Sequence, residues 1–173
     1  MTNLEKIFPS LAKFSDLNWT EVSNEYGKVS SKISFPEYLQ IKAEDGDCPE
    51  YLYELAYYEL AVHEANNPDI TFPQSGGIHL NPTALFLSLE FDIERMLKEA
   101  ELGKIEIYER HNVLCVYRDH KNIFQCVELD DDALDILEQL ENGPQKDLAF
   151  MRDKDHKEFL QLVNLNIVFN ISN

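Results

Sequence analysis

The 173-residue sequence has few basic residues. Lysine and arginine number 15 against 32 aspartates and glutamates, so the formal net charge is −17. A surface of this charge repels phosphate backbones, which argues against binding to nucleic acid. It attracts basic partners such as a Lys/Arg-rich peptide. The alternative is that the acidity only keeps the protein soluble.

Cysteine is also scarce, and long apolar runs are missing. Cys48, Cys115 and Cys126 form an odd set without CxxC spacing, which argues against a disulfide framework and a zinc knuckle. No apolar run is long enough to span a bilayer. The N-terminus lacks the basic and apolar regions of a signal peptide. We therefore expect a cytoplasmic protein that does not contact membranes.

The stretch Lys104–Leu129 is the most strand-like part of the chain. It holds three short runs of β-prone residues, separated by polar breaks at residues 110–112 and 119–122. In the first run Ile105 and Ile107 alternate with polar neighbours, the period-2 pattern of a half-buried strand. Short runs joined by tight polar turns predict an antiparallel meander. The predicted strands are residues 105–108, 113–118 and 123–129.

The rest of the chain has mainly helical patterns. Glu50–Ala65 is the strongest, and it is apolar on nearly every side, as in a buried or partner-covered helix. Asp130, Asp131 and Asp132 suit the free N–H groups of a helix N-terminus. The predicted helices are 4–14 (interrupted at Pro9), 16–27 with Asp16 as cap, 35–39, 92–102, 133–140, 145–152 and 155–165. Strands are predicted at 84–91 and 167–171, and a loop at 69–82.

These elements predict an α+β protein with two lobes. Residues 1–80 are expected to form a helical lobe. Residues 81–173 are expected to form a winged-helix-like lobe with a small antiparallel sheet. A winged helix suggests a transcriptional regulator or an anti-factor, and this stays the alternative function. The last predicted helix argues against it, because Lys157 lies between Asp155 and Glu158 and the helix is not basic.

No catalytic motif stands out. The sequence has no GxGxxG, GxxxxGK[ST], HExxH or GxSxG pattern. Of the five histidines, only His63 has a carboxylate, Glu59, at helical spacing. Two such residues are found in metal sites and small metalloenzymes, and more often in a half-buried ion pair. We therefore predict no metal site and no catalytic residue.

A sheet edge remains as the candidate site. An edge strand can accept an extended peptide as an added strand, and acidic walls favour a basic peptide. If the N–H of Gln125 faces the peptide, proline at that position should abolish binding. The alternative is an edge that the terminal strand 167–171 protects. The predicted groove residues are Asn122, Ile123, Phe124, Gln125, Cys126 and Val127, with Phe159 and Val163 beneath them.

Six segments in a fixed order resemble a known family. They are FPSLAKF, FPEYL, YLYELAYYELAVHEA, LNPTALFLSLEFDIERM, VYRDHKNIFQCVEL and DALDILEQLENG. In this order they resemble the partner proteins of multinuclear non-heme iron oxidases, which modify ribosomally made peptides. The MbnC-like proteins of methanobactin biosynthesis belong to this group, within the wider HvfC/BufC-type partner family.

The resemblance implies a non-catalytic subunit of a heterodimer. An MbnB-like iron oxidase would hold the iron and oxidise precursor cysteines to oxazolone and thioamide groups, and this subunit would carry no cofactor. The C-terminal lobe would act as a precursor-peptide recognition element that takes a basic leader as an added strand. The helical lobe would dock the enzyme. From the pattern of the 50–65 helix we predict Tyr53, Tyr57 and Leu60 as docking residues.

Overall fold

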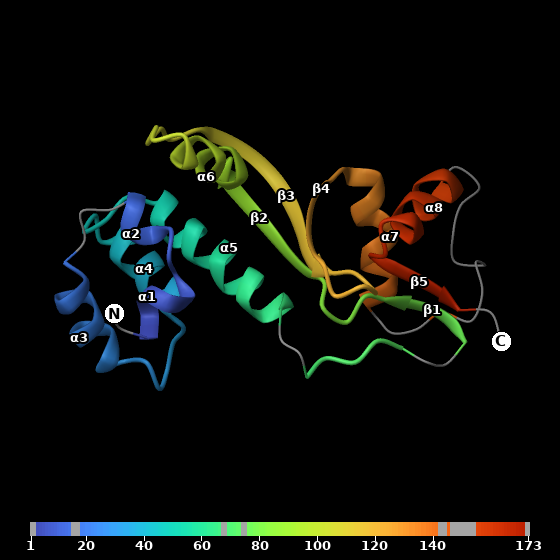
Figure 1. The fold of residues 1–173 in the computed structure, drawn as a ribbon, viewed down its shortest axis with the longest axis horizontal. Helices are drawn as coiled ribbons and strands as arrows, with labels where there is room; N and C mark the ends of the chain where they lie inside the picture. The colour runs from blue at the N-terminus through green and yellow to red at the C-terminus, as the bar shows by residue number, and fades with distance from the viewer. Residues whose placement is uncertain are drawn as a thin grey trace. The chain divides into compact units, whose positions relative to one another are not determined.

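The structure is a computed structural model that describes residues 3–14, 18–66, 69–73, 76–141, 145 and 155–171. The chain contains helices and small antiparallel sheets, so the predicted α+β class is confirmed. The chain divides into two compact units (Figure 1). Unit 1 comprises Met1–His63 and Ser88–Asn112, and unit 2 comprises Glu64–Leu87 and Val113–Asn173.

This division differs from the single boundary expected after residue 80. Residues 88–112 group with the N-terminal helices, although they follow the predicted boundary. The buried carboxylate of Glu54 accepts hydrogen bonds from the backbone N–H groups of Glu90 and Phe91, at 2.9–3.0 Å. Such a long-range contact leaves no periodic signal in the sequence.

Unit 1 contains most of the helices. They are α1 (Asn3–Ile7), α2 (Leu11–Phe14), α3 (Trp19–Gly27), α4 (Phe35–Glu44), α5 (Tyr51–Ala65) and α6 (Ile93–Glu101). A capping box starts α4, in which Ser34 and Glu37 bind each other's backbone N–H groups. Asn18 caps α3 by accepting from the Glu21 N–H group. The predicted cap Asp16 lies outside the described residues.

An aromatic cluster forms much of the unit 1 core. Phe35 contacts Phe8, Tyr26 and Tyr38, with ring centroids 4.9, 5.2 and 6.2 Å apart. Phe8, Phe35 and Tyr38 are at least nine-tenths buried. Aromatic pairs at such distances add stabilisation beyond the area that they bury. The short helices α1 and α2 are therefore held by tertiary packing, because helices of this length are not stable alone.

Among the described residues, unit 2 contains two sheets and two helices. Its elements are β1 (Gly77–Leu80), β4 (Phe124–Leu129), α7 (Asp131–Glu141), α8 (His156–Asn164) and β5 (Val168–Ile171), with parts of β2 (Leu85–Phe91) and β3 (Glu109–Arg118). One sheet has the order β2-β3-β4, and the other pairs β1 with β5. α7 packs against α8 and β1, and α8 against β5 (Figure 1). The core lies between these elements and includes Cys115, Tyr117, Ile136, Phe159, Leu162 and Ile167.

Three predictions are confirmed. They are the β3–β4 hairpin, the helix α7, and the strand expected at residues 84–91, which is β2. In the hairpin, pairing runs from Val113 opposite Leu129 to Arg118 opposite Phe124. α7 starts where the aspartate run was expected to cap it, and the Ala133 N–H donates to Asp130 Oδ1 at 2.9 Å. A C-terminal strand is also present, as β5.

Four other expectations need correction or fall outside the described residues. Residues 104–108 form no strand, and the expected break at 110–112 lies inside β3. Part of the expected 69–82 loop is β1. The predicted 145–152 helix lies outside the described residues except for Gln145, which pairs with Ile78. Asp155 precedes α8 but makes no side-chain capping bond.

Candidate functional site

The candidate site is the outer edge of β4. Within the described residues β4 is an edge strand, because β3 is its only hydrogen-bonded neighbour in the sheet. The alternative that the terminal strand protects this edge is wrong, because β5 pairs with β1. An edge strand is a template for an extended peptide.

The backbone hydrogen bonds of Arg118 show which β4 residues face the edge. Its N–H donates to Thr83 Oγ1 at 2.9 Å, and its carbonyl accepts from Asn81 Nδ2 at 3.0 Å. The backbone of Arg118 therefore points away from β4, so Arg118 and Phe124 are not a hydrogen-bonded pair. Because the two kinds of pair alternate in an antiparallel ladder, Tyr117 and Gln125 are hydrogen-bonded to each other.

It follows that Gln125 and Val127 point their backbone groups at β3. Phe124, Cys126 and Glu128 point theirs toward the outer edge. The expectation that the Gln125 N–H faces a bound peptide is therefore wrong. Hydrophobic periodicity does not indicate which set faces outward, because a shift of one residue exchanges the two sets.

The turn between β3 and β4 is fixed by Asp119. Its Oδ1 accepts from the N–H groups of Lys121 and Ile123, at 2.8 and 2.9 Å. The hydrogen bond from Ile123 is the main reason that the pKa of Asp119 is lowered. Asn122 adopts a left-handed backbone conformation, with φ of 61°, which asparagine tolerates better than most residues. Predicted groove residues Asn122 and Ile123 therefore belong to the turn.

Three predicted groove residues meet in the unit 2 core. Val127 on β4, with Phe159 and Val163 on α8, belongs to or packs against one apolar cluster. Phe159 is only 1% exposed, so it supports the site and does not line a surface. Two large apolar side chains of unit 2 remain exposed, Ile123 in the turn at 53% and Leu160 on α8 at 49%. The helical pattern predicts Leu160 on the apolar face of α8, so its exposure was not expected.

Carboxylates concentrate where β4 ends and the helices begin. Burial raises the pKa of Glu158 on α8, and the nearby carboxylates of Asp130 and Asp132 raise it further. Carboxylates from the start of α7 and from α8 therefore act on one another. This region favours a basic peptide over an acidic one.

The predicted docking residues lie on α5 in unit 1. Tyr53 and Tyr57 contact each other edge to face, with ring centroids 6.4 Å apart, and the Tyr57 hydroxyl donates to Gln40 Oε1 at 3.4 Å. Both rings and Leu60 are half-buried. The structure brings the two tyrosines together, and the docking role stays a prediction.

Glu59 and His63 do not act as a pair. Glu59 is 7% exposed, and its Oε1 accepts from the Ser10 N–H at 2.7 Å, at the start of α2. Burial raises its pKa. His63 is exposed. Across the ranges that the structure describes, no group of three or more His, Cys, Asp or Glu residues is arranged to hold a metal ion.

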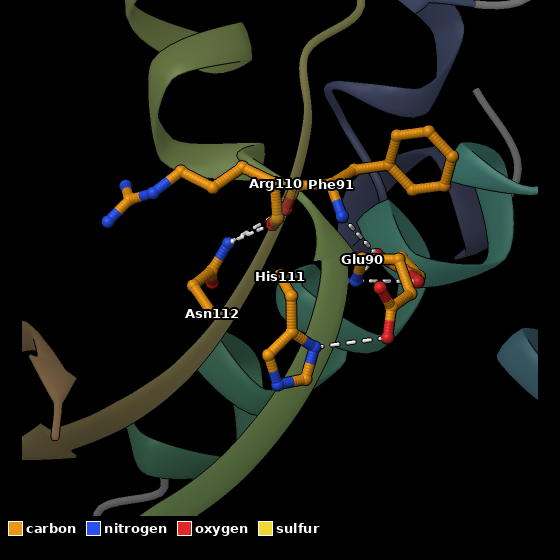
Figure 2. A network of polar contacts seen from close by, with 6 residues as sticks. Glu90, Phe91, Arg110, His111 and Asn112 are labelled. Carbon is orange, nitrogen blue, oxygen red and sulfur yellow. Dashed lines mark hydrogen bonds and ion pairs between the residues drawn. The ribbon is translucent and has the colours of Figure 1, made fainter. Parts of the chain in front are cut away.

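A polar network in unit 1 was not predicted from the sequence. The His111 Nδ1 atom lies 3.0 Å from Glu90 Oε1, and the Asn112 side chain donates to the carbonyls of Phe91 and Arg110 (Figure 2). The sequence predicts a break between strands at residues 110–112. The side chains of His111 and Asn112 instead bind β2, and Arg110 pairs with Asp92, the cap of α6; a pattern of hydrophobicity cannot show these contacts.

A hollow of about 250 Å³ lies between α3, α4 and the turn that follows α4. On its wall the Tyr38 hydroxyl donates to Glu25 Oε2 at 2.7 Å, and Lys42 Nζ lies 3.5 Å from the same oxygen and 3.0 Å from Asp47. Burial and Glu25 raise the pKa of Tyr38 to about 12. These groups satisfy one another, so the network stabilises the helix pair.

No family model matches the chain, and no curated protein matches it. In the part of the chain that the structure describes, no helix has both the length and the apolar character needed to cross a bilayer. Because no match assigns a function, the function of the site is inferred from its own residues.

Proposed function

We propose that this chain is a non-catalytic, peptide-binding subunit. It binds the basic leader of a ribosomally made precursor as an added strand on β4. It presents the precursor's cysteines to a multinuclear iron oxidase, its partner in a heterodimer, for oxidation to oxazolone and thioamide groups. The oxidase carries the iron, and the complex works in the cytoplasm.

The observation that carries this proposal is the position of β4 at the edge of the sheet. β5, the strand that would have covered this edge under the alternative interpretation, pairs with β1. Main-chain hydrogen bonds to such an edge supply affinity, and the side chains on either side supply specificity.

Charge and packing support a basic, extended ligand. The chain carries a net charge of −17, and carboxylates gather at the end of β4, as Glu158 shows. Beside β4 the site is supported by the apolar core cluster against which Val127 packs. A rigid support limits the entropy lost on binding. The family resemblance of the six sequence segments agrees with this role and supplies the identity of the proposed partner.

The first experiment is co-expression with a candidate multinuclear iron oxidase, followed by size-exclusion chromatography and titration of a basic leader peptide. The proposal expects a 1:1 complex that binds the leader only when this subunit is present. Purified protein that binds neither the oxidase nor the leader peptide would contradict the proposal.

Two variants at one position locate the leader. Phe124→Pro removes an outward-facing N–H at the first residue of β4, where proline is tolerated, and should weaken leader binding at least tenfold. Phe124→Ala keeps that N–H, so it should bind more tightly than the proline variant. Equal affinities would exclude β4 as the leader site.

A further inference from the structure

A second strand-like surface lies in unit 1, around residues 102–111. Ile105 and Ile107 are 53% and 40% exposed, and Leu102 at the preceding turn is 78% exposed. These residues carry the period-2 pattern of a half-buried strand, yet residues 104–108 form none. Clustered exposed apolar side chains mark interaction sites.

Contacts with α6 and within the segment fix the direction of one set of side chains. The Arg95 guanidinium lies 3.6 Å from the centre of the Tyr108 ring, and the Tyr108 hydroxyl donates to Glu106. Arg110 lies 3.3 Å from Asp92, the cap of α6. Glu106, Tyr108 and Arg110 therefore share the face turned toward α6.

The residues on either side of Arg110 lie on the opposite face. Side chains alternate along β3, so Glu109 and His111 lie opposite Arg110, and the exposed side chains of Ile105 and Ile107 precede them. Figure 2 shows the side chains of Arg110 and His111 pointing apart, with His111 directed at Glu90. The segment therefore starts apolar and becomes polar within a few residues.

The polar end of this segment opens into a hollow of about 460 Å³. Its lining residues are Glu50, Glu90, Phe91, Glu109, Arg110 and His111. Three carboxylates and one guanidinium give the lining a net negative charge. The hollow therefore suits a cationic side chain.

The backbone of the apolar end is available for pairing. Among the described residues, no backbone hydrogen bond joins Ile105, Glu106 or Ile107 to another segment. An extended partner segment can pair with such groups in the same way as with a strand edge.

We propose that residues 105–111 bind an extended segment of a partner protein in which apolar residues precede a lysine or arginine. The apolar residues cover Ile105 and Ile107, and the basic side chain enters the hollow between Glu50, Glu90 and Glu109. This inference goes beyond the proposed function, because it concerns a different surface and a different unit.

The probe is the synthetic peptide acetyl-Val-Thr-Val-Thr-Lys-Gly-Arg-amide, added to the isotope-labelled full chain and followed by NMR. We expect saturable shifts of the Ile105 and Ile107 methyl groups and of the His111 ring. A peptide with glutamate in place of lysine and arginine should cause none. Shifts confined to residues 124–128 would overturn this inference and leave the proposed function standing.

Matched variants separate a specific site from general charge attraction. Ile105→Thr with Ile107→Thr, and Glu50→Gln with Glu109→Gln, should each lower the affinity at least tenfold. Glu44→Gln with Glu64→Gln changes the net charge by the same amount at exposed positions of α4 and α5 and should change it less than twofold. Unchanged binding in the first two variants, or an equal loss in the third, would overturn the proposal.

Discussion

Residues 104–108 and β4 show that similar sequence patterns can have different outcomes. Both stretches are β-prone, and the first has the cleaner alternation of apolar and polar residues. β4 pairs with β3 along its whole length, whereas residues 104–108 form no strand. Val127 on β4 packs against the core, whereas Ile107 is 40% exposed.

The difference lies in the turn that precedes each stretch. Asp119 binds two N–H groups of the β3–β4 turn, which sets the register of the hairpin. Residues 104–108 follow Gly103 at the end of α6 and run on into β3 without a turn. An alternating pattern therefore reports amphipathic character, and pairing requires a partner strand within reach.

Proline substitutions should give the largest difference in the free energy of unfolding between the two stretches. Gln125→Pro removes an N–H that points at β3, so we expect a loss of about 3 kcal/mol or more in the free energy of unfolding. Ile107→Pro removes an N–H without a backbone partner in the described residues and should cost less than about 1 kcal/mol. Urea denaturation measures both. Similar losses at the two positions would contradict the pairing derived above.

Removing the turn carboxylate should have the next largest effect. Asp119→Ala leaves the N–H groups of Lys121 and Ile123 without their acceptor and should cost about 2 kcal/mol at neutral pH. The Ile123 N–H lowers the pKa of Asp119, so this stabilisation is present above the ordinary aspartate pKa. It is lost as the pH falls through the lowered pKa.

Urea denaturation at several pH values checks this effect. The stabilities of wild type and Asp119→Ala should converge in acid. A difference that stays constant with pH would show that the carboxylate charge makes no contribution. Asp119→Asn keeps one acceptor oxygen and should lie between the two.

The sequence could predict the local features of this fold but not the contacts between distant residues. α5, α7 and the hairpin were predictable, because periodicity and turn residues act over a few neighbouring positions. Glu54, which binds the N–H groups of Glu90 and Phe91, and the pairing of β5 with β1 were not, because both depend on residues far apart in the chain. The strand of the candidate site was predicted, and the residues that face outward from it were not, because that choice depends on register.

Matched polar substitutions should give the smallest effects. Val127→Thr places a hydroxyl against the core cluster and should cost about 1–2 kcal/mol. Ile107→Thr changes an exposed side chain and should stay within about 0.5 kcal/mol of wild type. Thermal denaturation followed by circular dichroism checks both. A larger loss at Ile107 would mean that residues 104–108 contribute to folding.

Amide hydrogen exchange along β4, with and without a basic leader peptide, tests the central claim most directly. In the free protein the Gln125 and Val127 amides should be protected by β3, and the Phe124 amide should exchange faster. Adding the peptide should slow exchange at Phe124 and leave Gln125 and Val127 nearly unchanged. Peptide binding with no added protection at Phe124, or with protection only in unit 1, would contradict strand addition at β4.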